Sequence, residues 1–173
     1  IGAILSKRSN ELWNTKRLRF SQVDFIDDFE VSSSLFETVE NWARELGCSE
    51  VHGPLGFCDL DREGMLVEGF DLRSMFITYY NHPYYIKHLQ RLGYVKDVDW
   101  VEFKIDVPDE NHEFYKKVHT MAQRVLERGR FHKAAVSSRS DYKPYLPQFF
   151  ELINDAYSRL YGVVDLNKKQ IKK

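Results

Sequence analysis

The sequence predicts a mixed α/β (α+β) fold, in which helices flank a sheet that combines antiparallel and crossover connections. Helix-like and strand-like segments follow one another along the 173 residues. Residues 30–46 repeat apolar positions every three or four residues, as one face of a helix does, and residues 94–107 alternate apolar and polar positions, as a half-buried strand does. With 43% apolar and 14% aromatic residues, the chain has enough apolar surface for a core.

The chain opens with two predicted strands. Residues 1–5 are expected to form the first strand, residues 6–15 a polar loop, and residues 18–26 the second strand. Because the first residue is Ile1 rather than a methionine, we expect the start of the natural protein to lie upstream. The apolar residues of the second strand are Phe20, Val23, Phe25 and Ile26.

A helix is predicted over residues 30–46, because its apolar residues share one face. Gly47 is expected to end it. Asp27 and Glu30 have the spacing of a capping box, in which each carboxylate accepts a hydrogen bond from a backbone N–H that the first turn leaves free. The apolar residues of the predicted face are Val31, Leu35, Val39, Trp42, Ala43 and Leu46.

Residues 50–57 predict a short strand that Gly53-Pro54 interrupts, since this pair cannot continue a central ladder. Residues 59–64 then predict a turn. Its spacing is similar to the first half of a calcium loop, but Phe70 stands where such a loop needs a bidentate glutamate, so a hairpin turn is favoured.

The middle of the chain continues the alternation of elements. Residues 65–67 are expected to return as a strand, and residues 84–92 to form a helix that begins after Pro83 and ends at Gly93. The alternation in residues 94–107 then predicts one long strand or two shorter ones.

The last third of the chain is separated from the rest by a cluster of breaker and capping residues that begins at Pro108. A helix over residues 112–128, a strand over residues 131–136 and a helix over residues 142–161 are expected to follow. The last helix has an apolar face and is crowded with tyrosines, which must pack on something large. These residues are Phe149, Ile153, Ala156 and Leu160, with Tyr142, Tyr145, Tyr157 and Tyr161.

Charge and cysteine content limit the setting of the protein. The 25 basic and 26 acidic residues give a net charge of −1, so no overall field attracts nucleic acid or a membrane, and neither is expected as a partner. The basic residues of 167–173 are interpreted as a solvated end.

Without a signal peptide or an apolar run of about 18 residues, a cytoplasmic, reduced protein is expected. Cys48 and Cys58 are predicted to be buried structural thiols; a Cys-His nucleophile with His52 is the alternative.

Residues 52–94 contain a series of short motifs in a fixed order. The motifs are His52-Gly53-Pro54-Leu55-Gly56-Phe57, Gly64-Met65-Leu66-Val67-Glu68-Gly69-Phe70-Asp71, Tyr80-Asn81-His82-Pro83-Tyr84-Tyr85 and Gly93-Tyr94. This stretch resembles the acyl-CoA N-acyltransferase (GNAT) superfamily, in particular a poorly characterised bacterial branch with tandem GNAT-like units. Gly-Pro, Gly-x-Leu-x-x-Gly-Phe and Asn-x-x-Tyr-Tyr occur here in the order found in that branch.

The resemblance implies a division of the chain. Residues 1–107 would be the C-terminal part of one GNAT-like domain, residues 108–132 a connecting helix, and residues 133–173 the start of a second GNAT-like unit, so that the chain is an internal fragment. A domain without its leading strands exposes a sheet edge, and a homodimer through that edge is therefore expected.

The resemblance also implies a CoA thioester, acyl-CoA or acetyl-CoA, as cosubstrate. In these enzymes backbone N–H groups at a helix start hold the pyrophosphate. The matching N–H groups here belong to Asp28, Phe29, Glu30 and Val31, a stretch without glycine or cation. Its carboxylates would repel a diphosphate by roughly 1 kcal/mol per contact, so a well-capped structural helix is the alternative.

Catalytic candidates follow from the same resemblance. In these enzymes a tyrosine four residues before the closing glycine protonates the departing thiolate, but Leu89 occupies that position. Tyr84, Tyr85 and His88 lie within two turns of it and are candidate acids, with simple packing as the alternative. The candidate bases are Asp24, Glu68 and Asp71.

Two functions are therefore predicted. The first is an acyl-CoA-dependent N-acyltransferase that transfers an acyl group from a CoA thioester to a small-molecule amine. The second is a catalytically degenerate GNAT-fold module that binds a small molecule or another protein. Binding of acyl-CoAs separates the two, because only the first function requires it.

Overall fold

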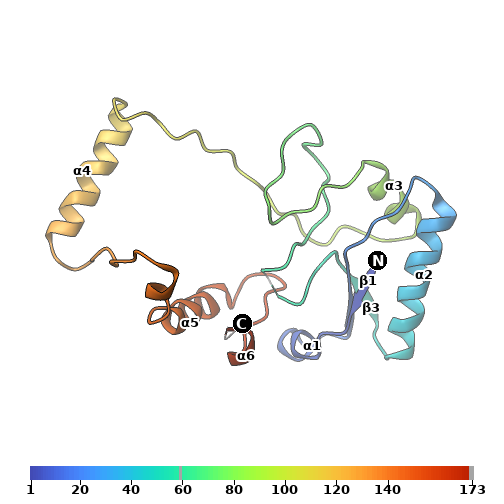
Figure 1. Ribbon diagram of the computed structural model, residues 1–173. Helices are drawn as coiled ribbons and strands as arrows, with labels where there is room; N and C mark the ends of the chain where they lie inside the picture. The colour runs from blue at the N-terminus through green and yellow to red at the C-terminus, as the bar shows by residue number, and fades with distance from the viewer. Residues whose placement is uncertain (59, 172–173) are drawn as a thin grey trace. The chain divides into compact units, whose positions relative to one another are not determined.

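A computed structural model of the protein describes residues 1–58 and 60–171 (Figure 1). The chain forms two compact units, one of Ile1–Asp99 with Phe149–Lys173 and the other of Trp100–Gln148. Every buried residue that the structure describes belongs to the first unit. The division into GNAT-like segments at residues 107 and 132 stays a prediction.

The first unit is built on a three-stranded mixed sheet, which confirms the predicted α/β class. Strands β1 (Gly2–Ile4), β2 (Arg17–Ser21) and β3 (Glu50–His52) follow in the order β1-β2-β3. β1 pairs with β2 antiparallel, and β2 pairs with β3 in parallel. Helix α2 (Phe29–Glu45) connects the parallel pair. β1 and β3 are the two edges of the described sheet. A homodimer through one of these edges stays a prediction.

The apolar core lies between β2 and α2. Leu18 and Phe20 alternate along β2 and point to the same face, where Phe20 meets Phe36 of α2 edge to face with ring centroids 5.1 Å apart. The buried face of α2 is turned slightly from the predicted one, because Val31, Trp42 and Leu46 stay exposed. Its buried residues are Ser32, Phe36, Val39 and Ala43.

Helix α1 (Lys7–Trp13) replaces the predicted polar loop, and that prediction was wrong. The Ser6 hydroxyl caps the helix by accepting a hydrogen bond from the Ser9 N–H at 3.2 Å. Asn14 ends it in the left-handed conformation with φ 49°. Ser9 is the one buried residue of α1, so caps and polar contacts define this helix more than an apolar stripe does.

β3 ends at His52, directly before a cis peptide bond between Gly53 and Pro54. The expected interruption of the strand at this pair is confirmed, although the strand does not resume. Gly53 lies so close to β2 that an added Cβ would stand 2.4 Å from the Phe20 carbonyl oxygen. The chain needs a glycine here because no side chain fits this close approach.

The strand predicted at residues 65–67 is absent from the described structure, and a side chain explains why. The Asn81 amide accepts a hydrogen bond from the Leu66 N–H at 2.6 Å and donates one to the Leu66 carbonyl at 3.1 Å. These bonds satisfy the backbone groups that a strand ladder would otherwise use. Asp61 makes a similar turn, in which its carboxylate accepts the Phe57 N–H at 2.7 Å; Asp59 lies outside the described residues.

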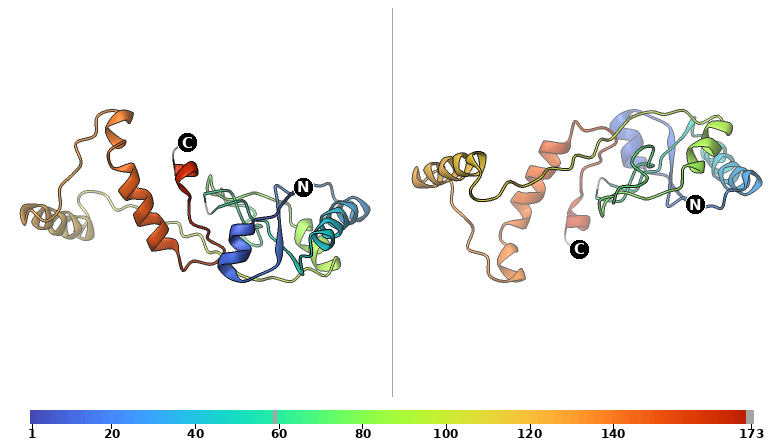
Figure 2. Two further views of the ribbon diagram at one scale, coloured as in Figure 1. Left: turned by 90° about the horizontal axis from the view of Figure 1, so that it is seen from below. Right: turned by 90° about the horizontal axis from the view of Figure 1, so that it is seen from above.

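Helix α3 (Tyr84–Arg91) follows Pro83, and Gly93 closes it with φ 90°, as predicted. In each view of Figures 1 and 2 it lies beside α2. Helix α2 is likewise followed by a glycine in the left-handed conformation, Gly47, with φ 70°.

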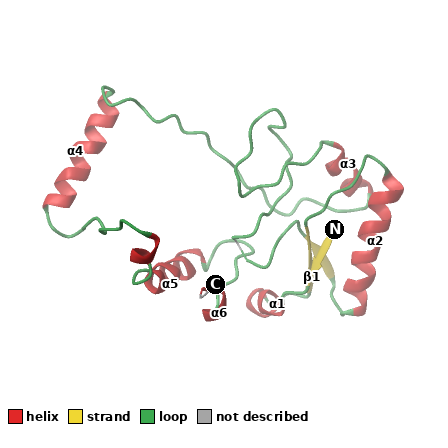
Figure 3. Cartoon of the chain, in the orientation of Figure 1, coloured by secondary structure: helices red, strands yellow, loops and turns green. Residues whose placement is uncertain are grey.

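The second unit consists mainly of loop around one long helix, as the colours of Figure 3 show. Helix α4 (Glu113–Glu127) confirms the predicted helix, and a 3-10 turn spans Arg139–Tyr142. The strands predicted at residues 94–107 and 131–136 are wrong. Most of their side chains lie exposed, although Tyr94 packs against the core and Val98 and Val136 are half-buried. Among the described residues neither stretch takes part in a strand pairing, which a strand requires.

Two helices complete the described chain. Helix α5 (Leu146–Tyr157) begins later and ends earlier than the predicted helix over residues 142–161, and α6 is the single turn Lys168–Ile171. Among the described residues, no helix combines the length and the apolar character that a bilayer span requires.

Candidate functional site

The polar side chains of α3 meet the segment that leads into α2. Tyr84 donates from its hydroxyl to the Phe25 carbonyl at 2.7 Å. Tyr85 accepts the Phe25 N–H at 3.2 Å and donates to the Asp24 carboxylate. Burial and this bond to Asp24 raise the pKa of Tyr85 to about 12, so its hydroxyl keeps its proton at neutral pH.

His88 extends the same contact by one turn. Its Nδ1 lies 2.8 Å from the Ser32 hydroxyl, and its Nε2 lies 3.0 Å from Asp27 Oδ1. Ser32, His88 and Asp27 are the residue types of a catalytic triad, in which a histidine activates a serine nucleophile and an aspartate orients the histidine. Ser32 is completely buried, however, and its hydroxyl also donates to the Phe29 carbonyl at 3.0 Å, so no substrate reaches it. The three side chains hold α3 against the start of α2.

The structure thus brings together the sequence-predicted candidates on α3 with those at the start of α2. Each hydrogen bond of Tyr84, Tyr85 and His88 described above goes to the segment 24–32. A catalytic role for these three residues stays a prediction. Leu89, which stands where the acyltransferases have a tyrosine, packs against the core. Glu68 and Asp71 lie exposed on the loop before α3.

The start of α2 does not fit a diphosphate. Asp28, not Asp27, caps the helix, and its carboxylate already accepts the N–H groups of Glu30 at 2.8 Å and Val31 at 3.4 Å. The expected Asp27–Glu30 capping box is therefore wrong. A diphosphate would have to displace the Asp28 carboxylate from these N–H groups. It would then still be repelled by the charges of Asp27 and Glu30.

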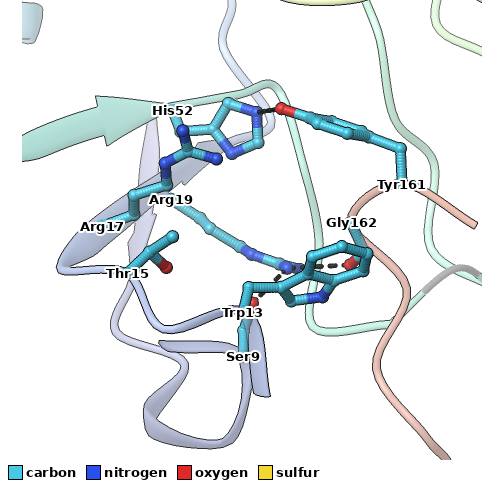
Figure 4. A pocket seen from close by; sticks show the side chains of 8 residues that line it. All are labelled: Ser9, Trp13, Thr15, Arg17, Arg19, His52, Tyr161 and Gly162. Carbon is cyan, nitrogen blue, oxygen red and sulfur yellow. Dashed lines mark hydrogen bonds between the residues drawn. The ribbon is translucent and has the colours of Figure 1, made fainter. Parts of the chain in front are cut away.

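A different group of polar residues lies on the other face of the sheet. Because side chains alternate along a strand, Arg17 and Arg19 of β2 point away from the face of Leu18 and Phe20. His52 pairs with Arg19 in the register of β2 and β3 and so shares its face. Helix α1 and the segment around Tyr161 cover these residues and enclose a small pocket, shown in Figure 4.

Arg19 is the buried centre of this pocket wall. Its guanidinium donates to the Gly56 carbonyl at 2.8 Å, the Ser9 hydroxyl at 2.7 Å and the Gly162 carbonyl at 3.0 Å. In Figure 4 its head group points to Ser9 and Gly162 across the pocket. Three parts of the chain that are far apart in sequence therefore meet on one cation, which gives the pocket a positive wall.

His52 and Tyr161 form the opposite part of the wall. His52 Nε2 lies 2.9 Å from the Tyr161 hydroxyl and 3.3 Å from Asp97 Oδ2, and Tyr161 donates its proton to the same carboxylate. Because the Tyr161 hydroxyl donates its proton to Asp97, its oxygen accepts from His52, and the ring proton of His52 is therefore assigned to Nε2. The neutral ring then keeps its lone pair on Nδ1.

The surroundings tune both groups. Burial is the main cause that lowers the pKa of His52 below its ordinary value, and the positive charge of Arg17 adds to it against the opposing charge of Asp97. His52 is therefore neutral at physiological pH. Burial and the hydrogen bond to Asp97 raise the pKa of Tyr161 to about 12, which keeps its hydroxyl protonated.

This arrangement can accept a proton and stabilise the charge that results. A neutral imidazole next to a carboxylate is a general base, and the carboxylate stabilises the imidazolium that forms. The pocket has a free volume of about 30 Å³, enough for water or the polar end of a small amine but not for an acyl chain. Among the described residues, no three His, Cys, Asp or Glu side chains are placed to bind one metal ion.

Sequence reasoning missed this pocket, because the pattern of β2 does not show that its polar face is covered. The sequence Arg17-Leu18-Arg19-Phe20 alternates cations with large apolar residues, which is typical of a strand with one face in the core and the other exposed to water. The sequence offers His52 only as a partner for cysteine. The structure leaves Cys48 and Cys58 half-buried rather than buried, and His52 contacts Tyr161 and Asp97 instead.

Comparison with known proteins places the chain beside two curated bacterial proteins. It is 35% identical over 80 residues to Protein YghO of Escherichia coli (strain K12). The aligned region covers 46% of this chain and 20% of that protein. It is 27% identical over 146 residues to the Bacterial ceramide synthase of Caulobacter vibrioides (strain NA1000 / CB15N), which covers 83% of this chain and 36% of that protein.

No protein-family model and no solved structure matches the chain. The aligned region spans about a fifth of the length of YghO and about a third of the length of the ceramide synthase. The chain is therefore similar to part of each of these two longer bacterial proteins.

Proposed function

We propose that this chain is part of an enzyme that transfers an acyl group to an amine. The observation that carries the proposal is the similarity to a bacterial ceramide synthase, because it extends over 83% of the chain. Ceramide is the amide of a fatty acid and a long-chain amine, so a ceramide synthase by its name forms an N-acyl bond. The GNAT-like motifs around Gly53-Pro54 and Tyr84-Tyr85 support the same reaction class from the sequence.

The pocket beneath the sheet offers the group that this reaction needs. An amine attacks an acyl carbonyl only as the neutral base and must lose a proton as the amide forms. We assign the proton acceptor to Nδ1 of His52, whose pKa is lowered by burial. Asp97 and Tyr161 would stabilise the imidazolium through Nε2. The arginines, Arg17 and Arg19, favour the negative charge that develops on the carbonyl oxygen.

An acyl thioester, acyl-CoA or acetyl-CoA, is the proposed acyl donor, as the resemblance implies. As the C–N bond of the amide forms, the C–S bond of the thioester breaks, and the departing thiolate takes up the proton that His52 removed from the amine and leaves as the CoA thiol. The start of α2 does not fit its diphosphate, because the Asp28 carboxylate occupies the N–H groups of Glu30 and Val31. The proposed chemistry of the amine therefore rests on the His52 pocket alone, and no binding mode for the CoA part follows from this helix start.

The test is an acylation assay with the natural protein that contains this chain, using acyl-CoAs of different length and long-chain primary amines. Loss of a general base lowers kcat by about 10²–10⁴-fold, so this is the expected effect of His52→Gln. His88→Gln is the matched control: it changes an imidazole that contacts Ser32 and Asp27, and it is expected to lower stability more than kcat.

Two results would contradict the assignment. If His88→Gln abolished turnover in a folded protein while His52→Gln kept it, the sequence-predicted acids on α3 would be the catalytic groups. If no amine were acylated with any acyl-CoA, the transferase proposal itself would fail.

A binding module without catalysis is the second candidate, and one observation favours it. The helix start that would hold CoA in an acyltransferase is closed by its own cap. Under this candidate an amine or acyl compound binds without turnover. Calorimetry that detects a long-chain amine but no acyl-CoA, together with an inactive acylation assay, would support this function over the first.

A further inference from the structure

Helix α4 carries an apolar stripe that the rest of the second unit leaves exposed. Phe114, Val118, Met121 and Val125 recur at spacings of four, three and four residues, so they lie in one line along the helix. Their exposed fractions are 61%, 49%, 65% and 37%, and no residue of α4 is buried. An exposed apolar line of this length is unfavourable in water and indicates an interaction surface.

Cations border the stripe on one side. At 3.6 residues per turn, Lys117, Arg124 and Arg128 lie within about 60° of Met121 around the helix axis. The opposite side of the helix carries polar residues, including Thr120 and Gln123. The helix therefore has an apolar face, a polar face and a cationic flank between them.

The positive charge extends beyond the helix. Residues 112–143 contain eight Lys or Arg residues and three Asp or Glu residues, a net charge of +5. Since the whole chain has a net charge of −1, the other residues together carry −6. The expectation that no membrane is a partner rests on the balanced total of the whole chain, which does not show this separation. The cations are Lys116, Lys117, Arg124, Arg128, Arg130, Lys133, Arg139 and Lys143.

We propose that α4 and the basic segment after it bind an anionic lipid surface. Amphipathic helices with a basic polar face lie in the plane of the membrane interface, with the apolar face at the boundary of the acyl chains. Phe114, Val118, Met121 and Val125 would enter that boundary. Lys117, Arg124 and Arg128 have long apolar stems that let their charges reach the phosphate groups. This proposal differs from the expectation that net charge alone gives.

Charge argues against two other occupants of the stripe. In a coiled coil of two copies, Lys117 and Arg124 would flank the seam, but the positions on its other side are Tyr115 and Ala122, so no acidic partner is available. Nucleic acid would use the cations but gains nothing from the apolar line beside them. An anionic lipid surface uses both.

The test measures cosedimentation of the full chain with vesicles and does not depend on the proposed reaction. Binding is expected with phosphatidylcholine vesicles that contain phosphatidylglycerol, much less with pure phosphatidylcholine, and should weaken as salt rises. Met121→Glu places a charge in the stripe, and Gln123→Glu adds the same charge on the polar face. The first is expected to weaken binding at least about tenfold more than the second.

A second pair of variants tests the charges. Lys117→Gln with Arg124→Gln is expected to weaken binding to the anionic vesicles and to reduce its salt dependence. Because no residue of α4 is buried, all of these variants should keep the melting temperature of the protein. Met121→Trp gives a further readout, since the fluorescence emission of the new tryptophan should shift to shorter wavelength on anionic vesicles.

Four outcomes would overturn the proposal. They are absence of vesicle binding, equal effects of Met121→Glu and Gln123→Glu, tighter binding to duplex nucleic acid than to vesicles, and a fall in melting temperature or oligomer size caused by Met121→Glu alone. The last would show that the stripe packs against protein.

Discussion

Asp27 and Asp28 are neighbours in the chain with different tasks. Asp28 closes the first turn of α2 through the N–H groups of Glu30 and Val31, whereas Asp27 turns outward to the His88 ring. The sequence predicts a cap in this place but selects the wrong aspartate. Either carboxylate suits a cap, and the choice depends on His88, which lies 61 residues away.

His52 makes the stability of the protein depend on pH. Its pKa in the folded state lies below the ordinary value of 6.5 because the ring is buried. The unfolded state therefore binds more protons below that pH, and the folded state loses stability as the pH falls through it. Urea unfolding at about pH 7.5 and about pH 5.5 measures this loss.

His52→Gln should reduce the difference in unfolding free energy between the two pH values, because glutamine does not titrate. His119→Gln is a suitable control, since His119 lies exposed on α4. An unchanged pH dependence in His52→Gln would show that the folded protein does not suppress protonation of this ring.

At the scale of elements, sequence pattern predicted three of the helices, whether or not the helix has a buried face. Helices α2, α3 and α4 lie close to the predicted ranges, and their ends follow local signals such as Pro83 and Gly93. Pattern failed for residues 65–67 and 94–107, because a strand requires a partner that sequence does not show. Asn81 replaced that partner in the first case.

The α2 cap gives a prediction at the same scale. Asp28→Ala should lower the unfolding free energy by about 1 kcal/mol, since it leaves the N–H groups of Glu30 and Val31 without an acceptor. Chemical denaturation followed by circular dichroism measures the loss. Asp27→Asn is the control and should cost less, because Asp27 is exposed and its interaction with His88 is screened by water. If Asp27→Asn lowered the unfolding free energy more than Asp28→Ala, the assignment of Asp28 as the cap would be wrong.

At the scale of the whole molecule, the first unit is discontinuous in sequence. The chain leaves it after Asp99, forms the second unit and returns at Phe149. The returning segment is fixed by Arg19 to the Gly162 carbonyl at 3.0 Å and by the Trp13 indole to the Val163 carbonyl at 3.0 Å. These contacts join residues more than 140 positions apart, and no local pattern predicts them.

This arrangement predicts that a cut in the second unit leaves the first unit assembled. A protease site inserted between Ala134 and Ala135, which lie in an exposed loop, should yield two fragments that elute together in gel filtration. A denaturing gel of the same fraction would show both. Trp13→Phe removes one of the joining hydrogen bonds and should increase the dissociated fraction. Complete separation of the wild-type fragments would contradict the assignment of the returning segment to the first unit.

The return of the chain at Phe149 also bears on how such proteins can diverge. Closing a flexible loop costs conformational entropy that grows only with the logarithm of its length, so doubling the stretch Trp100–Gln148 would cost about 0.6 kcal/mol. Insertions, deletions or a different helix in that stretch are thus nearly neutral for the pocket around Arg19. We therefore expect that this segment, and with it the lipid-binding surface proposed for α4, can be exchanged while the pocket around Arg19 is kept.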